Sequence, residues 1–273
     1  MSLSLQTATT QWLAEYVRVH RAAQSYRLAQ TRVDRYFLAF FDATRALDTL
    51  TKADLQRYRA WLTKQGIALQ TQAHVLADAR CFLRWAADIG LLDREPIPRR
   101  LLPRIPDRLP DRLTDDEVAR LITIPDPHGR IVRFGLATGL RWGEMTRART
   151  QDIQNGVLLV GQTKSGRVRR IPLPPGMLAE LRSHVGRIVP VSSSASFTKA
   201  VRAKSGVARF HPHQLRHTFA CRWMEDGGSV AALKEILGHQ SITTTERYAR
   251  LSDDMVKREA ERLYGKEASV QGG

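Results

Sequence analysis

Apolar residues in the first hundred positions recur every three or four residues, the spacing of amphipathic helices. The pattern runs through four segments, about 10–20, 25–42, 51–66 and 71–88. Thr51 supplies a hydroxyl that can cap the third helix, and Gly66 is placed to end it. Since no alternating strand pattern interrupts these segments, residues 1–92 are predicted to form a bundle of four helices.

A proline-rich stretch follows this helical part. Residues 93–112 contain five of the twelve prolines and six arginines. Proline at this density cannot continue a helix or a central strand and favours extended chain. The stretch is therefore predicted to be an interdomain linker, and its arginines suit a path along the phosphates of a nucleic acid.

The rest of the chain predicts mainly helices around one small β hairpin. Thr114 and the three acidic residues after it predict the start of a helix. The apolar run 157–160 and the alternating run 168–173 predict two strands, with Lys164 in the turn between them. Further helices are predicted at about 129–149, interrupted near Gly139, and at about 176–185, 195–204, 212–224 and 229–237. We expect a second domain over 113–265 and a disordered tail at 266–273.

The distribution of charge favours a nucleic-acid partner. The chain carries a net charge of +16, and the stretch from Ile153 to Met224 holds twelve Lys or Arg but a single acidic residue, Glu180. A field of one sign attracts a polyanion, most commonly nucleic acid. An anionic membrane is the alternative, but no basic amphipathic helix with an aromatic face is present, and no apolar run approaches the ~18 residues of a membrane span.

The termini and cysteines favour a reducing compartment. The first residues lack the basic region and apolar core of a secretory signal. Cys81 and Cys221 fall in different predicted domains, at a spacing typical of neither a disulfide framework nor a metal site. We expect a cytoplasmic protein associated with DNA.

The chemistry is concentrated in the run His211 to His217 and in the residues that follow it. On the predicted helix, His213, Arg216 and His217 are separated by three and four positions and share one face. His239 follows Leu237-Gly238 on a turn, and Tyr248 lies nine residues further on. Together they offer a cation, proton carriers and a nucleophile whose free pKa is near ~10. Such a set suits the chemistry of a phosphodiester.

Two upstream residues each have two interpretations. Arg141 follows Gly139-Leu140, where a glycine permits close backbone approach, so it suits a phosphate; it can equally be a surface arginine paired with Glu144. Lys164 at the hairpin turn is either simply solvated or a proton donor whose pKa is lowered by neighbouring cations.

The ordered set resembles the tyrosine recombinase (phage integrase) family, in particular its Xer-like and integrase-like site-specific recombinases. The matching text is Thr138-Gly139-Leu140-Arg141-x-x-Glu144, Lys164 in a hairpin, His213-x-Leu215-Arg216-His217-Thr218, Leu237-Gly238-His239 and Thr245-x-x-Tyr248. The similarity covers most of the chain. It implies a helical, SAM-like core-binding domain followed by an α+β catalytic domain.

The resemblance also implies a role for each matching residue. Tyr248 would attack the scissile phosphate to give a 3′-phosphotyrosine, while Arg141 and Arg216 would bind its non-bridging oxygens. Lys164 would protonate the leaving 5′ oxygen, and His213 and His239 would share proton transfer and hydrogen bonding to the phosphate. Glu144 and His217 would orient these groups. No metal and no other cofactor is implied.

The implied partners are double-stranded DNA recombination sites and further copies of the chain. A homotetramer would hold two sites and a Holliday junction, for integration, excision or dimer resolution. Residues 253–264, with apolar positions at helical spacing, are the candidate for a C-terminal helix exchanged between subunits. An accessory protein or a partner recombinase is compatible with this scheme.

Three alternatives remain open from the residues. His211-x-His213-x3-His217 has a spacing that can bind zinc, as in a metal-dependent hydrolase, although Arg216 lies among the histidines and no acidic residue is near. A DNA-binding protein of the same fold that no longer cleaves is the second. A topoisomerase-like enzyme that relaxes DNA through the same covalent step is the third.

Overall fold

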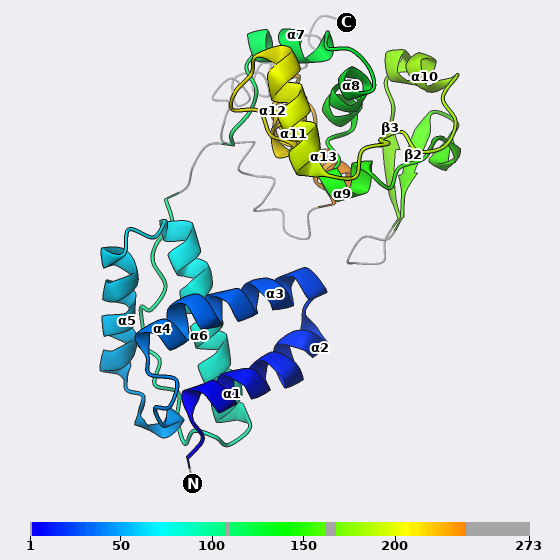
Figure 1. The fold of residues 1–273 in the computed structure, drawn as a ribbon. Helices are drawn as coiled ribbons and strands as arrows, with labels where there is room; N and C mark the ends of the chain where they lie inside the picture. Colours follow the sequence, from blue (N-terminus) through cyan, green and yellow to red (C-terminus); the bar gives the residue numbers. More distant parts are fainter. Residues whose placement is uncertain (1, 107–109, 162–167, 239–273) are drawn as a thin grey trace, which may run out of the picture. The chain divides into compact units, whose positions relative to one another are not determined.

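The computed structural model describes residues 2–106, 110–161 and 168–238 (Figure 1). The chain divides into two compact units, Met1–Asp107 and Arg108–Gly273. The described residues are mainly helical, with one small antiparallel sheet in the second unit, which confirms the predicted fold class. In these ranges no helix is long and apolar enough to cross a bilayer.

The first unit begins with two long helical segments, each containing one turn of π-helix. Their parts are α1 (Leu5–Trp12), a π turn (Leu13–Val17) and α2 (Arg18–His20), then α3 (Ala23–Arg32), a π turn (Val33–Phe37) and α4 (Leu38–Phe40). The predicted start near Thr10 was wrong. The Ser4 hydroxyl accepts a hydrogen bond from the amide of Thr7 at 3.2 Å and starts the helix one and a half turns earlier.

Two further helices, α5 (Lys52–Lys64) and α6 (Leu69–Asp88), complete the bundle. Thr51 caps α5 as predicted: its hydroxyl accepts from the amide of Asp54, and the Asp54 carboxylate accepts from the amide of Thr51. The aromatic residues form the core of the unit. The rings of Trp12 and Phe82 lie 5.8 Å apart, and those of Phe37 and Tyr58 lie 5.7 Å apart.

Two arginines of the first two helical segments form ion pairs with a buried carboxylate. Arg21 and Arg32 pair with the buried carboxylate of Asp78 at 2.8 and 2.7 Å. Asp78 lies on α6, so these ion pairs fasten the first two helical segments to it. The carboxylate is buried because Asp78 falls on the same face of α6 as Val75, Ala79 and Phe82.

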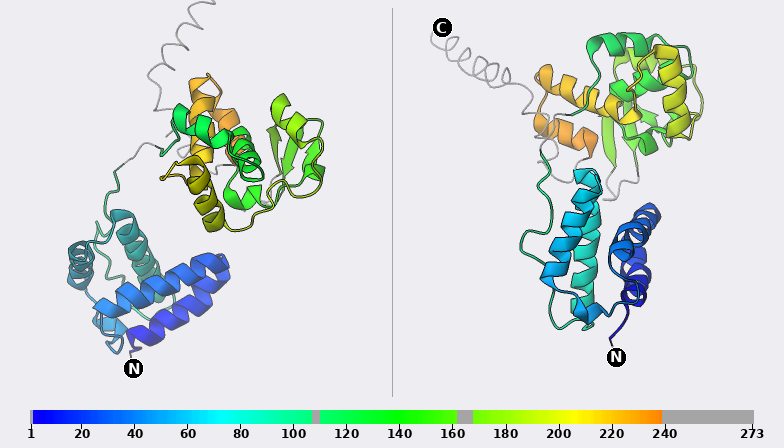
Figure 2. Two further views of the ribbon diagram at one scale, coloured as in Figure 1. Left: turned by 45° about the horizontal axis from the view of Figure 1, so that its top comes forward. Right: turned by 60° about the vertical axis from the view of Figure 1, so that its left-hand side comes forward.

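The second unit packs helices around α8 and beside a three-stranded sheet (Figure 2). Its helices are α7 (Asp115–Ile122), α8 (His128–Thr138), α9 (Trp142–Met145), α10 (Pro175–Leu181), α11 (Ser194–Ser205), α12 (Pro212–Glu225) and α13 (Val230–Leu237). Thr114 caps α7, as predicted. Ser229 precedes α13 as predicted, but its side chain makes no capping hydrogen bond.

The sheet has the order β1-β2-β3 and is antiparallel throughout. Its strands are β1 (Ile153–Gln154), β2 (Val157–Val160) and β3 (Arg169–Pro172), with Leu158 opposite Ile171 in the register. The hairpin of β2 and β3 was predicted. The strand β1 was not, because two residues are too few to show an alternating pattern.

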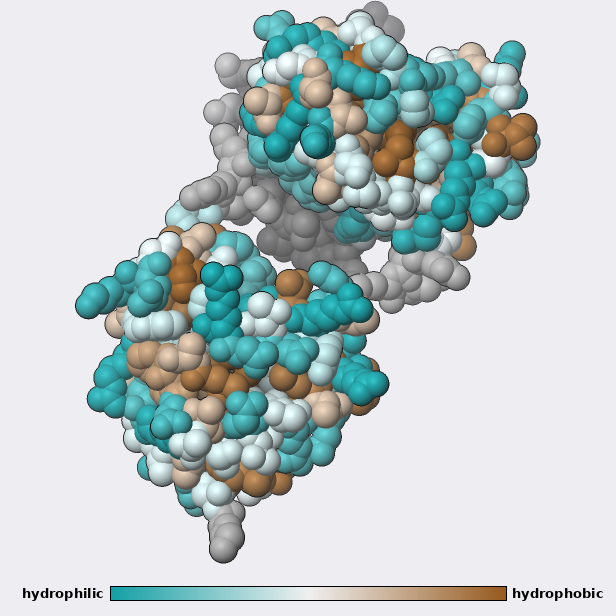
Figure 3. All heavy atoms as spheres, viewed as in Figure 1, coloured by the Kyte–Doolittle hydropathy of each residue, from teal (hydrophilic) through white to brown (hydrophobic). Residues whose placement is uncertain are grey.

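Close packing of α8 against α12 holds the residues of the candidate site. Gly135 on α8 permits the approach, because a Cβ at this position would lie 2.7 Å from Leu215 Cδ1 on α12. Both helices contribute to one core, in which Phe134 and Leu215 are fully buried. On the drawn face of this unit, apolar residues appear only in small separate groups among hydrophilic ones (Figure 3).

Candidate active site

Helix α12 carries the central residues of the site. The helix begins at Pro212, as the sequence predicts, and His211 occupies its N-cap position. The rings of His213 and His217, one turn apart, lie 4.5 Å from each other at an interplanar angle of 84°. Arg216 lies between them in sequence and is buried. The three side chains expected on one face are therefore brought together.

Arg216 joins two segments that are distant in sequence. It is 2% exposed; its Nη1 donates to the carbonyl oxygen of Gly139 at 3.0 Å, and its Nη2 donates to that of Leu237 at 2.9 Å. Gly139 lies after α8, two residues before Arg141, and Leu237 ends α13, two residues before His239. A single guanidinium thus holds the backbone that leads to Arg141 and the backbone that leads to His239.

Position 139 accommodates only glycine. Its φ of +62° is in the left-handed region, and an added Cβ would lie 2.4 Å from Cδ1 of Phe219 on α12. The position of the carbonyl oxygen that accepts from Arg216 therefore depends on a glycine at this residue. The predicted break in the helix near Gly139 is confirmed, and α9 begins after Arg141.

Arg141 lies at the N-terminus of α9 and contacts Glu144. One carboxylate oxygen of Glu144 accepts from the amide of Arg141 at 2.9 Å, and the other accepts from Nη1 of its guanidinium at 3.2 Å. The pairing that the sequence left open is therefore present. The Arg141 side chain nevertheless remains 46% exposed, whereas Glu144 is 10% exposed. Arg141 is thus both paired and accessible to a ligand.

The electrostatic surroundings of the site favour a neutral His213. Loss of hydration lowers the pKa of His213 from its usual 6.5, and the positive charges of Arg216, His211 and Arg141 lower it further. Burial alone would raise the pKa of Glu144. Its hydrogen bond from the Arg141 amide and its contact with Arg169 outweigh that effect, so the pKa is lowered and the carboxylate stays ionised.

The structure adds one residue that the sequence reasoning did not select, Arg169. Its side chain is 6% exposed, and Nη2 lies 2.7 Å from Oε1 of Glu144. Its Nη1 donates to the carbonyl of Ile236 in the last turn of α13 at 2.8 Å. The signal was present in the sequence: alternation over 168–173 places Arg169 on the same face as Ile171 and Leu173, the apolar face.

Other predicted positions fall outside the described residues. These are Lys164, His239, Tyr248, the proposed exchanged helix at 253–264 and the tail at 266–273. The residue before His239, Gly238, is described. Its φ is +65°, which ends α13 as predicted.

The histidines considered for zinc are arranged for other contacts. Nε2 of His211 lies 3.1 Å from Asp111 Oδ2, which also accepts from Nε2 of Gln214 at 3.0 Å. His213 and His217 instead face each other one turn along α12. Across the described ranges, no three His, Cys, Asp or Glu side chains are grouped as metal ligands.

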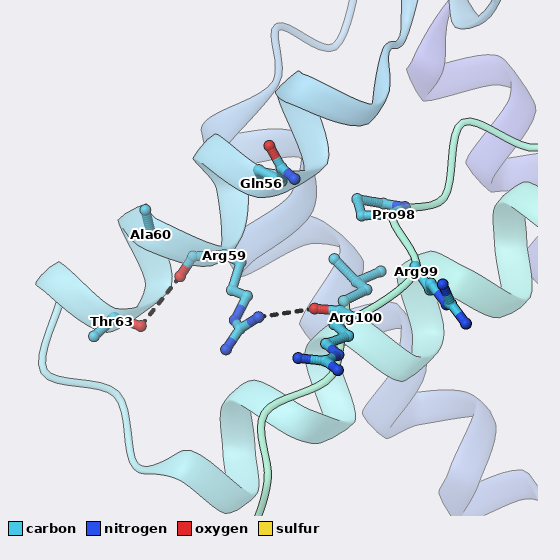
Figure 4. Close-up of a pocket in the computed structure, with 8 residues that line it drawn as sticks. Gln56, Arg59, Ala60, Thr63, Pro98, Arg99 and Arg100 are labelled. Atoms are coloured by element: carbon cyan, nitrogen blue, oxygen red, sulfur yellow. Dashed lines mark hydrogen bonds between the residues drawn. The ribbon is translucent and has the colours of Figure 1, made fainter.

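A basic hollow lies in the first unit, where the chain after α6 runs along α5 (Figure 4). It has a volume of about 800 Å³ and is bordered by Arg59, Arg99 and Arg100. Nη1 of Arg59 donates to the carbonyl of Arg100 at 2.8 Å and holds the two segments together. A second hollow shares these three arginines with the first and is bordered by six arginines in all and one acidic residue, Glu95. Such a surface suits an extended polyanion.

Comparison with known proteins identifies relatives over most of the chain. Residues 111–255 match the phage integrase family. Tyrosine recombinase XerA of Pyrococcus furiosus is 31% identical over 237 residues, which cover 78% of this chain and 80% of that protein. Tyrosine recombinase XerD of Listeria innocua is 26% identical over 252 residues, covering 80% of this chain and 84% of that protein.

Solved structures share the fold. A lambda integrase dimer bound to a COC′ core site gives a TM-score of 0.73 at 18% identity, covering 89% of this chain and 97% of that one. The Tn1549 transposon integrase in complex with circular intermediate DNA gives a TM-score of 0.74 at 18% identity, covering 95% of this chain and 100% of that one. The family match and the relatives show that this chain belongs to the phage integrase family of tyrosine recombinases.

Proposed function

We propose that this chain is a site-specific DNA recombinase that cuts and rejoins strands through a 3′-phosphotyrosine. The observation that carries the proposal is the double hydrogen bond of Arg216, because it brings the backbone beside Arg141 and the turn before His239 to the same guanidinium. Arg141 and Arg216 come from separate segments and both act on the pKa of His213, and two such arginines suit one phosphate with two non-bridging oxygens.

In the proposed reaction, the Tyr248 hydroxyl attacks the scissile phosphorus and the bond from phosphorus to the 5′ oxygen breaks. Lys164 gives a proton to the leaving 5′ oxygen. Arg141 and Arg216 offset the charge of the pentavalent transition state. The 3′-phosphotyrosine conserves the energy of the phosphodiester, so attack by the 5′ hydroxyl of another strand completes the exchange without a nucleotide cofactor.

His213 suits the removal and return of a proton. Its lowered pKa leaves the imidazole neutral near pH 7 and able to accept a proton from Tyr248 or hydrogen bond to the phosphate. His239 would share this role from the other side of the site. His217 lies against the ring of His213 and holds its orientation.

We propose a division of labour between the two units. Residues 1–92 would bind DNA as the core-binding domain, residues 93–112 would link the units, and residues 113–265 would carry the catalysis. The basic hollow formed by Arg59, Arg99 and Arg100 supports a phosphate contact of the first unit. With DNA as substrate, the proposed location is the cytoplasm.

Recombination further requires four protomers and two DNA sites. Two solved structures of the same fold are a lambda integrase dimer on a core site and a lambda integrase tetramer bound to a Holliday junction. We propose a homotetramer in which the C-terminal helix is exchanged between subunits. This assembly is compatible with an accessory protein or a partner recombinase.

The test is to supply two copies of a duplex that the protein has enriched from a random pool, in a chelating buffer. Sequential strand exchange predicts a four-way DNA product that migrates as a branched species. Relaxation of a supercoiled plasmid that lacks the site would favour the topoisomerase-like alternative. Specific binding with no covalent product would favour the protein that no longer cleaves.

A further inference from the structure

Arg169 is a buried arginine outside the set of residues assigned to the reaction. It begins β3, where side chains alternate between buried and exposed, and it points to the buried face while Arg170 points to solvent. Removing a guanidinium from water is costly unless it is paired and hydrogen-bonded. The partners of Arg169 therefore indicate its role in the protein.

The first contact joins Arg169 to Arg141 through Glu144. Oε1 of Glu144 lies 2.7 Å from Nη2 of Arg169 and 3.2 Å from Nη1 of Arg141. The other oxygen of the same carboxylate holds the Arg141 amide. Two cations thus share one partly buried negative charge, and the attraction that Glu144 exerts on the Arg141 guanidinium is reduced by the presence of Arg169.

The second contact joins Arg169 to the end of α13. Its Nη1 binds the carbonyl of Ile236, while Arg216 binds the neighbouring carbonyl of Leu237. The last carbonyls of a helix lack partners within the helix and carry partial negative charge, so two arginines satisfy them here. The end of α13 is consequently fixed from two sides.

The third contact is steric and concerns Gly238, the residue before His239. A Cβ on Gly238 would lie 2.7 to 2.9 Å from Cδ, Nε and Nη1 of Arg169. The backbone at Gly238 therefore rests directly on the Arg169 side chain. A displacement of this side chain would therefore act on the backbone of Gly238, the residue before His239.

We propose that Arg169 is a positioning residue that adjusts both halves of the active site. By neutralising Glu144 it leaves the Arg141 guanidinium available to the phosphate, and by supporting Gly238 it fixes the start of the turn that carries His239. It does not itself touch the phosphate. This inference rests on the proposed function, since it concerns the orientation of the residues that would perform the cleavage.

The test compares Arg169→Met, Arg169→Lys, Glu144→Gln and the double variant Arg169→Met/Glu144→Gln in the full chain. Single-turnover cleavage of a suicide duplex is measured at saturating protein, with DNA affinity and thermal unfolding measured in parallel. Arg170→Met is the matched control, because it removes the same charge from the exposed face of the same strand.

We expect Arg169→Met to slow cleavage by about 10- to 100-fold, the same size of loss as when a residue that orients a metal ligand is removed, with DNA affinity close to that of the unaltered protein. Glu144→Gln keeps an oxygen for the Arg141 amide but removes the charge. The double variant should therefore cleave faster than Arg169→Met alone. Arg169→Lys should be intermediate, since one ammonium replaces a fork that reaches two acceptors.

Cleavage by Arg169→Met at the rate of the unaltered protein would overturn the inference. So would a loss that matches the loss of folded protein and is not relieved in the double variant, because that result indicates a structural role only. Failure of the unaltered protein to form any covalent adduct would instead contradict the proposed function itself, and the two failures are thereby distinguishable.

Discussion

Arg216 donates a hydrogen bond to the carbonyl oxygen of Gly139 across 77 positions of sequence, at 3.0 Å. Its second hydrogen bond, to Leu237, occupies the other edge of the same guanidinium. A lysine has three donors but all on one nitrogen, so it lacks the planar fork whose two terminal nitrogens reach separate acceptors. The position therefore requires arginine for its geometry as well as for its charge.

Arg216→Lys should slow single-turnover cleavage by about 10²- to 10³-fold, the effect of removing one preorganised donor from a transition state. Arg222→Lys is the control on the same helix, since Arg222 pairs with Asp115 at the surface, where Asp115 is 93% exposed. Equal rates for the two variants would contradict the role given to Arg216.

Gly139→Ala should destabilise the protein by at least about 2 kcal/mol, because a left-handed φ and a contact of 2.4 Å with Phe219 act together. Gly176→Ala is the matched control: Gly176 lies in the first turn of α10, and a Cβ there meets nothing within 4 Å. Its expected change is a stabilisation of about 0.4 to 1 kcal/mol. Urea unfolding measures both, and equal free energies of unfolding would show that Gly139 is not required.

His213 should titrate below its usual pKa of 6.5, since reduced hydration and the neighbouring cations both disfavour the protonated ring. Because the folded state prefers the neutral ring, this residue favours folding above about pH 6.5, and that contribution is lost as the pH falls through the folded pKa. NMR titration of the ring, assigned with His213→Gln, measures the value. A midpoint at or above 6.5 would contradict the described surroundings.

Arg99→Gln/Arg100→Gln should weaken DNA binding and reduce the dependence of log affinity on log salt by about one per arginine. The backbone carbonyl of Arg100 that holds Arg59 is retained in this variant. Lys52→Gln, an exposed cation in the first turn of α5, serves as the control. If both proteins show the same salt dependence, the basic hollow does not contact phosphate.

The sequence predicted the parts of this fold that depend on local pattern. The caps at Thr51 and Thr114, the hairpin and the helix that begins at Pro212 all follow from residue type and spacing. The membership of the family followed from the order of the site residues. These features need no knowledge of tertiary contacts.

Features that depend on long-range contacts were missed or misjudged. The ion pairs of Arg21 and Arg32 are not predicted, because nothing near these residues in sequence indicates the carboxylate of Asp78. Arg169 was passed over although its strand position marks it as inward-facing, since its partners Glu144 and Ile236 lie 25 and 67 positions away. The pairing of distant segments, rather than the elements themselves, is what spacing alone does not reveal.

The assignment of Tyr248 as the nucleophile is the central claim, and covalent trapping tests it most directly. The protein is incubated without Mg²⁺ with a suicide duplex carrying its selected site, and the products are separated in SDS. The unaltered protein should give a protein–DNA adduct whose linkage maps to Tyr248, and Tyr248→Phe should bind the same duplex but give none. An adduct that persists in Tyr248→Phe would contradict the account.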